Sequence, residues 1–223
     1  LMLESILALT DFSPIVKGVF DDYVWIDLSN KNTALAKVDT NNSEKFSEYV
    51  NQFLSDNNSK IAIGGYNEPR SIYKRSEEFN STELEERFIH LGLDLWTKVN
   101  TPIFAPLEGK IHSFKNNAIE GNYGPTIILE HSLKGNVFYT LYGHLTTASL
   151  DGLEVGKIIN SEEAFAAIGN YPENGDYPPH LHFQVIKDIN GMEGDFPGVT
   201  SLINQKADLK NCLDPNLILK IRL

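Results

Sequence analysis

From Phe88 onward the chain alternates apolar and polar residues, a pattern typical of β-strands that have one buried face. Turn signals rich in Gly, Asn and Pro interrupt the alternation. Short strands at nearly regular spacing predict an antiparallel β architecture. The expected strands cover residues 89–96, 109–114, 125–131, 137–142, 165–168 and 181–186.

The first 66 residues mix helical and strand patterns. Residues 43–56 carry apolar side chains at positions 46, 49, 50, 53 and 54, which share one helical face. Asn42 or Ser43 can cap the start of this helix, and the Asp-Asn-Asn run at 56–58 ends it. Residues 24–28 and 60–64 are short, rich in β-branched side chains and predict two strands.

These patterns predict a mainly β protein, α+β overall, in two regions. A small α/β region over residues 1–80 is expected to pack on a β-rich domain over residues 81–223. The connecting segment carries charges of both signs and lacks the Gly and Ser of a flexible linker. We therefore expect the two regions to be in contact.

Composition and charge narrow the class of protein. Nineteen Lys and Arg stand against 30 Asp and Glu in 223 residues, a formal charge of −11. With no basic stripe to neutralise phosphates, nucleic acid is not an expected partner. Anionic membranes and anionic wall polymers should repel such a surface. No apolar run approaches the roughly 20 residues of a membrane span, so membrane insertion is not expected either.

The chain carries weak signals about its compartment. Residues 1–9 are apolar but contain Glu4 and lack a basic flank, so we do not expect them to act as a secretory signal. The single cysteine, Cys212, excludes an internal disulfide and leaves the compartment undecided. We expect a soluble protein, either cytoplasmic or a trimmed exported form, of unassigned oligomeric state.

The first candidate chemistry lies in the segment 89–95, Ile-His-Leu-Gly-Leu-Asp-Leu. In a strand, His90, Gly92 and Asp94 share the face opposite four aliphatic side chains. Positions four apart in an extended strand are separated by about 13 Å, too far for two short side chains to share a metal comfortably. A shared metal therefore requires a bend, and Gly92 at the midpoint is where a bend costs least.

A second pattern is Pro-Pro-His-Leu-His-Phe at 178–183. It places His180 and His182 on one strand face with Cα atoms about 6.6 Å apart, close enough to serve one site. The two prolines lack N–H donors and favour a strand that begins at an edge or loop mouth. His144 follows Gly143 where another expected strand ends, a position that suits a functional site.

The remaining histidines, His112 and His131, have no such partners and are expected to be structural. The residue types available favour zinc as the metal. Two imidazoles and one carboxylate are a catalytic zinc set that leaves a fourth position for water. A structural site of four thiolates is excluded because the chain has one cysteine.

These motifs resemble those of the lysostaphin-type (LytM-like) zinc endopeptidases. The family pattern of His-x-x-x-Asp, Tyr-x-His-Leu and His-Leu-His-Phe matches residues 90–94, 142–145 and 180–183, in that order. The resemblance covers roughly residues 88–187. It implies that His90, Asp94 and His182 hold Zn²⁺, and that His144 and His180 are the catalytic histidines, with their individual roles undivided.

The resemblance also implies the activity, a zinc-dependent metallopeptidase that hydrolyses a peptide bond, with a peptide or peptidoglycan cross-link as substrate. The alternatives are an amidase acting on a small peptide-like metabolite and a non-catalytic, metal-bound module that binds peptides. The charge of −11 argues against adhesion to an anionic wall.

Two further sequence features concern the subfamily of the protein and its regulation. Segments 65–73 and 194–199 resemble a peptidase-like module sometimes fused to class III aminotransferases, which extends the likeness to about residues 60–220. Asn67 or Glu68, just upstream of the site, could supply a fourth metal ligand and hold the enzyme latent. The competing interpretation is a solvated turn.

Overall fold

The computed structural model describes residues 2–19, 22–75 and 86–222. The expected boundary between residues 80 and 81 lies outside the described residues, so the division into two regions stays a prediction.

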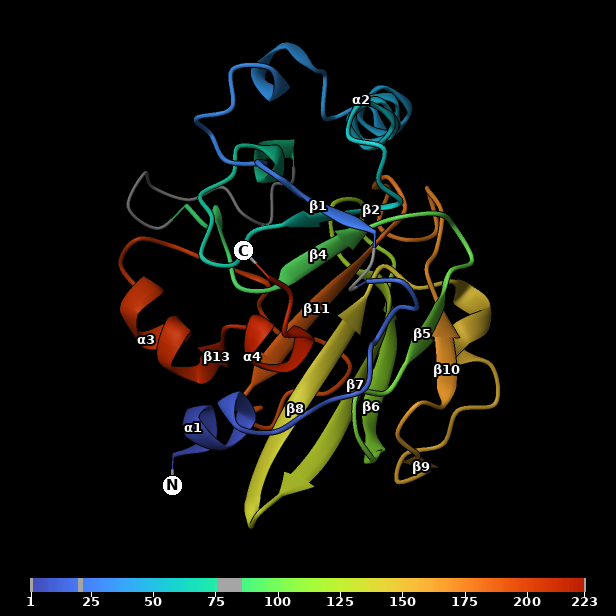
Figure 1. Cartoon of the computed structure of the whole chain (residues 1–223), viewed down its shortest axis with the longest axis vertical. Helices are drawn as coiled ribbons and strands as arrows, with labels where there is room; N and C mark the ends of the chain where they lie inside the picture. The colour runs from blue at the N-terminus through green and yellow to red at the C-terminus, as the bar shows by residue number, and fades with distance from the viewer. Residues whose placement is uncertain (1, 20–21, 76–85, 223) are drawn as a thin grey trace.

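A nine-stranded sheet forms the centre of the part of the chain that the structure describes (Figure 1). Its strands follow the order β1-β2-β4-β11-β8-β7-β6-β9, and β13 pairs with the last residues of β11. Their bounds are β1 (Tyr23–Ile26), β2 (Ile61–Gly64), β4 (Leu93–Trp96), β6 (Gly109–Asn117), β7 (Gly124–Leu133), β8 (Asn136–Gly143), β9 (Ile158–Ile159), β11 (His180–Ile186) and β13 (Cys212–Leu213).

Two small antiparallel sheets flank the large one. They pair β5 (Pro102–Phe104) with β10 (Ala164–Ala167), and β3 (Ile89–His90) with β12 (Val199–Thr200). The predicted mainly β, antiparallel fold is confirmed. The exception is the first pair, because β1 and β2 run parallel, joined by a crossover that contains a helix.

Local sequence explains the longest hairpin. Strands β7 and β8 are joined by Lys134 and Gly135, which have φ angles of +47° and +79°. Two consecutive left-handed residues form the turn whose twist matches the twist of the flanking strands. This turn sets the register in which seven residue pairs of β7 and β8 face each other.

Alternation along β11 separates the core from the polar residues. Leu181, Phe183 and Val185 point into the main buried cluster, which also contains residues of α1 (Leu3–Ala8) and α4 (Asn216–Leu219). Each such side chain contributes roughly 1.5–3 kcal/mol on burial. The intervening residues, His180, His182 and Gln184, therefore lie on the opposite face of the sheet.

The N-terminal helix is confirmed as α2 (Ser43–Asp56). Its cap is Asn42, whose side-chain oxygen accepts a hydrogen bond from the Lys45 amide at 3.0 Å. The buried side chains of Phe46 and Val50 belong to a second cluster that includes Trp96 of β4. Because β2 also pairs with β4, residues before and after position 80 share one sheet.

The expectation of one continuous strand over 89–96 is wrong, because the segment forms two short strands. The strand ends at His90, the chain bends at Gly92, and β4 begins at Leu93. The two pieces pair with different partners, β3 with β12, and β4 with β2 and β11. The bend that a shared metal site requires is therefore present.

The remaining elements are short and carried no strong sequence pattern. They are α3 (Gln205–Asn211) and the 3₁₀ helices η1 (Leu35–Lys37), η2 (Ile72–Arg75) and η4 (Thr147–Leu150). Within the described ranges, no helix has the length and apolar character needed to cross a membrane.

The buried histidine of β7 yields a prediction about stability. Burial lowers the pKa of His131 to about 4, against an ordinary value of 6.5. Between these values the unfolded chain binds a proton that the folded chain does not, so stability falls as the pH drops below 6.5. The loss should reach about 2 kcal/mol at pH 5.

His131→Asn removes this titration, so urea unfolding between pH 7 and pH 5 should show a smaller loss of stability for the variant. Equal losses for wild type and variant would contradict the assignment.

Candidate metal centre

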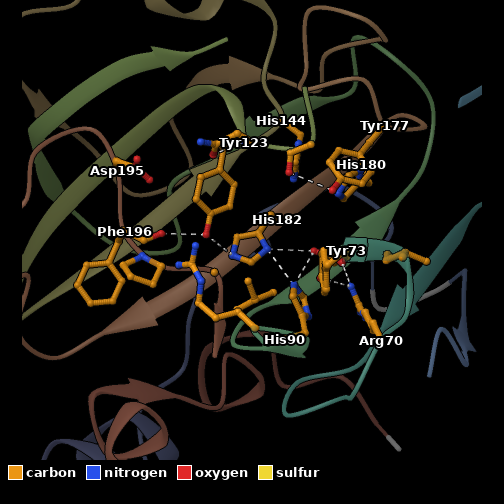
Figure 2. A pocket seen from close by; sticks show the side chains of 18 of the residues that line it. Arg70, Tyr73, His90, Tyr123, His144, Tyr177, His180, His182, Asp195 and Phe196 are labelled. Carbon is orange, nitrogen blue, oxygen red and sulfur yellow. Dashed lines mark hydrogen bonds and ion pairs between the residues drawn. The ribbon is translucent and has the colours of Figure 1, made fainter. Parts of the chain in front are cut away.

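Strand register brings the predicted site residues together. In the antiparallel pair of β4 and β11, His182 faces Asp94 and His180 faces Trp96. His90 reaches the same place from β3, on the other side of the bend at Gly92. Figure 2 shows His90 and His182 converging on one point, with His144 and His180 as a separate pair beside them.

Three ligand-type atoms meet at this point. His90 Nε2 lies 2.9 Å from His182 Nδ1, and each of these nitrogens lies 3.2 Å from Asp94 Oδ1. All three residues are buried, and Asp94 Oδ1 has no hydrogen-bond partner. This cluster is the one group of its kind among the residues that the structure describes.

The tautomer of His90 follows from its other ring nitrogen. His90 Nδ1 lies 2.9 Å from the carbonyl oxygen of Gly65, which can only accept a hydrogen bond. Nδ1 must therefore carry the proton. Burial and, next, the charge of Arg70 lower the pKa of His90 to about 4, so the ring is neutral near pH 7. Its Nε2 therefore presents a lone pair.

The tautomer of His182 follows from Gln184. The Gln184 amide nitrogen donates to the Pro197 carbonyl at 3.0 Å, which leaves the amide oxygen facing His182. His182 Nε2 lies 2.9 Å from that oxygen and therefore donates to it. In the neutral ring, Nδ1 then presents a lone pair toward His90.

When both rings are neutral, three electron-rich atoms thus face one another. Burial alone would raise the pKa of Asp94, but the neighbouring positive charge of Arg70, which donates to Oδ2, helps to hold the pKa well below its usual value. The carboxylate is therefore ionised. Such an arrangement is repulsive by itself and becomes favourable around a cation. The donor set fits a metal ion, and both imidazoles have the fixed outer hydrogen bond typical of metal ligands.

His144 and His180 form the second pair. Their rings stack tilted at 33°, with centroids 4.1 Å apart. Each Nδ1 donates to a backbone carbonyl, His144 to Asn174 at 2.7 Å and His180 to Pro178 at 2.8 Å. Burial lowers the pKa of both rings, that of His180 to about 4. Both are therefore neutral near pH 7, with Nε2 able to accept a proton.

The backbone at His144 is unusual. Its φ angle of +62° lies in the left-handed region, which only a few per cent of residues other than glycine adopt. The preceding Gly143 faces His182 across the strands and has no room for a side chain, because a Cβ there would lie 2.7 Å from the Tyr123 ring. Strain of this kind concentrates at functional sites.

These groups line a cavity of about 170 Å³. Aromatic side chains dominate its walls: Tyr73, Trp96, Tyr123, Tyr177 and Phe196.

Comparison with known protein families identifies the family that these site residues match. Residues 88–194 match peptidase family M23. These residues form a peptidase M23 domain. The match includes every residue of the two histidine groups and Asp94, and it confirms the lysostaphin-type resemblance. The narrower likeness to modules fused to aminotransferases stays a prediction.

Curated relatives of the M23 domain include two enzymes of Vibrio cholerae. The chain is 28% identical to the peptidoglycan DD-endopeptidase ShyB over 122 residues, which is 53% of this chain. It is 25% identical to the peptidoglycan DD-endopeptidase ShyA over 116 residues, or 51% of the chain. These matches cover only 26% and 24% of the two relatives, so the chain spans about a quarter of their length.

Among solved structures, the chain is similar to the catalytic domain of the antimicrobial peptidase lysostaphin from Staphylococcus simulans. The two are 25% identical with a TM-score of 0.42, and the alignment covers 60% of this chain and 80% of that chain.

Sequence reasoning missed Trp96, whose ring stacks on His180 with centroids 3.9 Å apart and an angle of 14°. A signal was available, because strand alternation puts Trp96 on the same face as Asp94.

Sequence reasoning also missed the role of Arg70, which lies outside the M23 match and donates to Asp94 Oδ2 at 2.5 Å. No local pattern distinguishes Arg70 from a surface arginine.

Asn67 and Glu68, the two candidates for a fourth metal ligand, do not belong to the cluster of His90, Asp94 and His182. The Glu68 carboxylate accepts from Arg70 at 2.7 Å, and the Asn67 side chain accepts from Gln205 at 2.7 Å. Neither joins the three-atom cluster, so the geometry gives no support to a latent fourth ligand. His112 bonds Ser113, and His131 bonds Glu108 and Thr140; neither histidine lines the cavity.

The bend residue provides a test of the centre. A Cβ at Gly92 would lie 2.6 Å from His182 Cε1 and 2.8 Å from the Phe183 carbonyl oxygen. Gly92→Val should therefore displace the His182 ring and weaken metal binding by at least about tenfold, the size of effect seen when a ligand loses its support. Competition with a metal chelator measures this affinity.

The control is Ile158→Val, at a side chain that is 52% exposed and does not line the cavity. Its metal affinity should equal that of wild type. An unchanged affinity in Gly92→Val would contradict the inferred role of the bend.

Proposed function

We propose that this chain is a zinc-dependent metallopeptidase in which His90, Asp94 and His182 hold the metal. The observation that carries the proposal is the convergence of three buried ligand-type atoms, two imidazole nitrogens and one carboxylate oxygen, at 2.9–3.2 Å. Two imidazoles and one carboxylate are a zinc set found in hydrolases. When bound, zinc supplies a Lewis acid and lowers the pKa of a coordinated water to about 7.

His144 and His180 act as the proton-transfer residues. Each offers an unprotonated Nε2 at the cavity, so each can accept the proton of an attacking water. An imidazole protonated in this way can then donate the proton to the leaving amine. Trp96 keeps the His180 ring in place by stacking, and the Nδ1 bonds keep both rings in the required tautomer.

We propose a peptide bond in a peptidoglycan cross-link as the substrate. Two relatives of the M23 domain carry the name peptidoglycan DD-endopeptidase, which supports this substrate class. The cavity of about 170 Å³ suits a single peptide unit, and its aromatic walls can pack against the aliphatic parts of a peptide stem.

Zinc content provides the first test. Purified wild type should contain about one zinc per chain, because the residues that the structure describes form one three-residue centre. His182→Ala should lose the metal, whereas His144→Ala and His180→Ala should keep it. Metal analysis after gel filtration checks this, and loss of zinc in all three variants would contradict the division into ligands and proton-transfer residues.

Hydrolysis provides the second test. Wild type should cleave cross-linked muropeptides from purified peptidoglycan, and His144→Ala and His180→Ala should lose activity by about 10²–10⁴-fold. His112→Ala, outside the cavity, is the matched control and should retain activity. Cleavage of small amides with no cleavage of peptidoglycan would replace the proposed substrate class. Zinc-bound protein with full activity in both variants would contradict the proposed catalytic roles.

A further inference from the structure

We propose that Arg70, which comes from the N-terminal region and not from the M23 match, is a positioning residue that holds Asp94 for the metal. The inference rests on the proposed zinc centre. Arg70 is only 1% exposed, which is rare for an arginine and requires that its donors be satisfied inside the protein.

The guanidinium group is held from several sides. Its Nη1 donates to Asp94 Oδ2 at 2.5 Å and to the Tyr73 hydroxyl at 3.0 Å. Its Nε donates to Glu68 Oε1 at 2.7 Å. A planar fork fixed in this way cannot swing, so it determines where Asp94 Oδ2 lies.

The two oxygens of Asp94 consequently have different tasks. Oδ2 is bound by Arg70, whereas Oδ1 has no hydrogen-bond partner and faces His90 and His182. Arg70 therefore orients the carboxylate so that a single, unshared oxygen points to the metal position. An outer donor of this kind fixes a ligand's orientation.

The fold leaves room for this arginine. Gly64 of β2 faces Asp94 across the strands, and a Cβ at Gly64 would lie 2.8 Å from Arg70 Nη2. The strand that the N-terminal region adds to β4 thus has no side chain at the position where the guanidinium passes.

Charge by itself does not explain the arrangement. A cation beside the centre would repel a metal ion, but the Glu68 carboxylate at 2.7 Å offsets the charge of Arg70. Removing both charges together leaves the net charge unchanged and removes the donor that orients Asp94. The double variant Arg70→Met with Glu68→Gln separates the two explanations and avoids a buried, unpaired Glu68.

The experiment measures the Zn²⁺ dissociation constant by competition with a chromogenic chelator, together with thermal unfolding of the metal-free protein. The double variant should bind zinc about 10–100-fold more weakly than wild type. Arg70→Lys should show a smaller loss, because an ammonium group keeps a donor and a charge near Asp94 but lacks the planar fork that fixes the direction of the bond. Lys110→Met removes a cation from a surface pair with Glu130 and should bind zinc like wild type.

The outcomes distinguish this inference from the proposed function. A double variant that binds zinc as tightly as wild type would overturn the positioning role, and so would a variant that loses thermal stability but not affinity. If the double variant does not fold, Arg70→Lys decides, and wild-type affinity in that variant would overturn the role. A wild type that binds no zinc would instead overturn the proposed centre, and this inference with it.

Discussion

The candidate centre depends on one electrostatic constraint: two imidazole nitrogens and one carboxylate oxygen lie within 3.2 Å of one another in a buried place. The ring N–H groups of both histidines donate hydrogen bonds to acceptors outside the cluster. His90 donates to a backbone carbonyl and His182 donates to Gln184. The lone pairs that remain meet at 2.9 Å beside an ionised carboxylate. In a buried place this arrangement is stable only around a positive charge.

The surrounding structure holds these three ligand-type atoms close together. Strand register puts Asp94 opposite His182, and the bend at Gly92 brings His90 back to them. The opposite face of the same strands carries the aliphatic side chains of the main core, so packing energy on one face holds the polar geometry of the other. This division explains how a carboxylate and four imidazoles can be buried together on one face of the sheet.

Much of this was accessible from sequence, and the limits have physical causes. Period-two alternation identified most of the long strands, and helical spacing identified α2 with its cap at Asn42. The site histidines and Asp94 were found because their motifs are local. The strand break at Gly92 and the parallel pairing of β1 with β2 depend on partners distant in the chain. Arg70 escaped notice for the same reason, since its meaning lies in a contact 24 residues away.

The pairing of β2 with β4 determines which length of the chain is needed for an intact sheet. The family match begins at residue 88, yet in the native sheet β4 is an interior strand, bonded to β2 on one side and to β11 on the other. A fragment cut at the family boundary would turn β4 into an open sheet edge, ready to pair with other chains. The same cut would strip the carboxylate of Asp94 of its guanidinium partner. The residues that match the family model are therefore fewer than the residues that complete the sheet around β4.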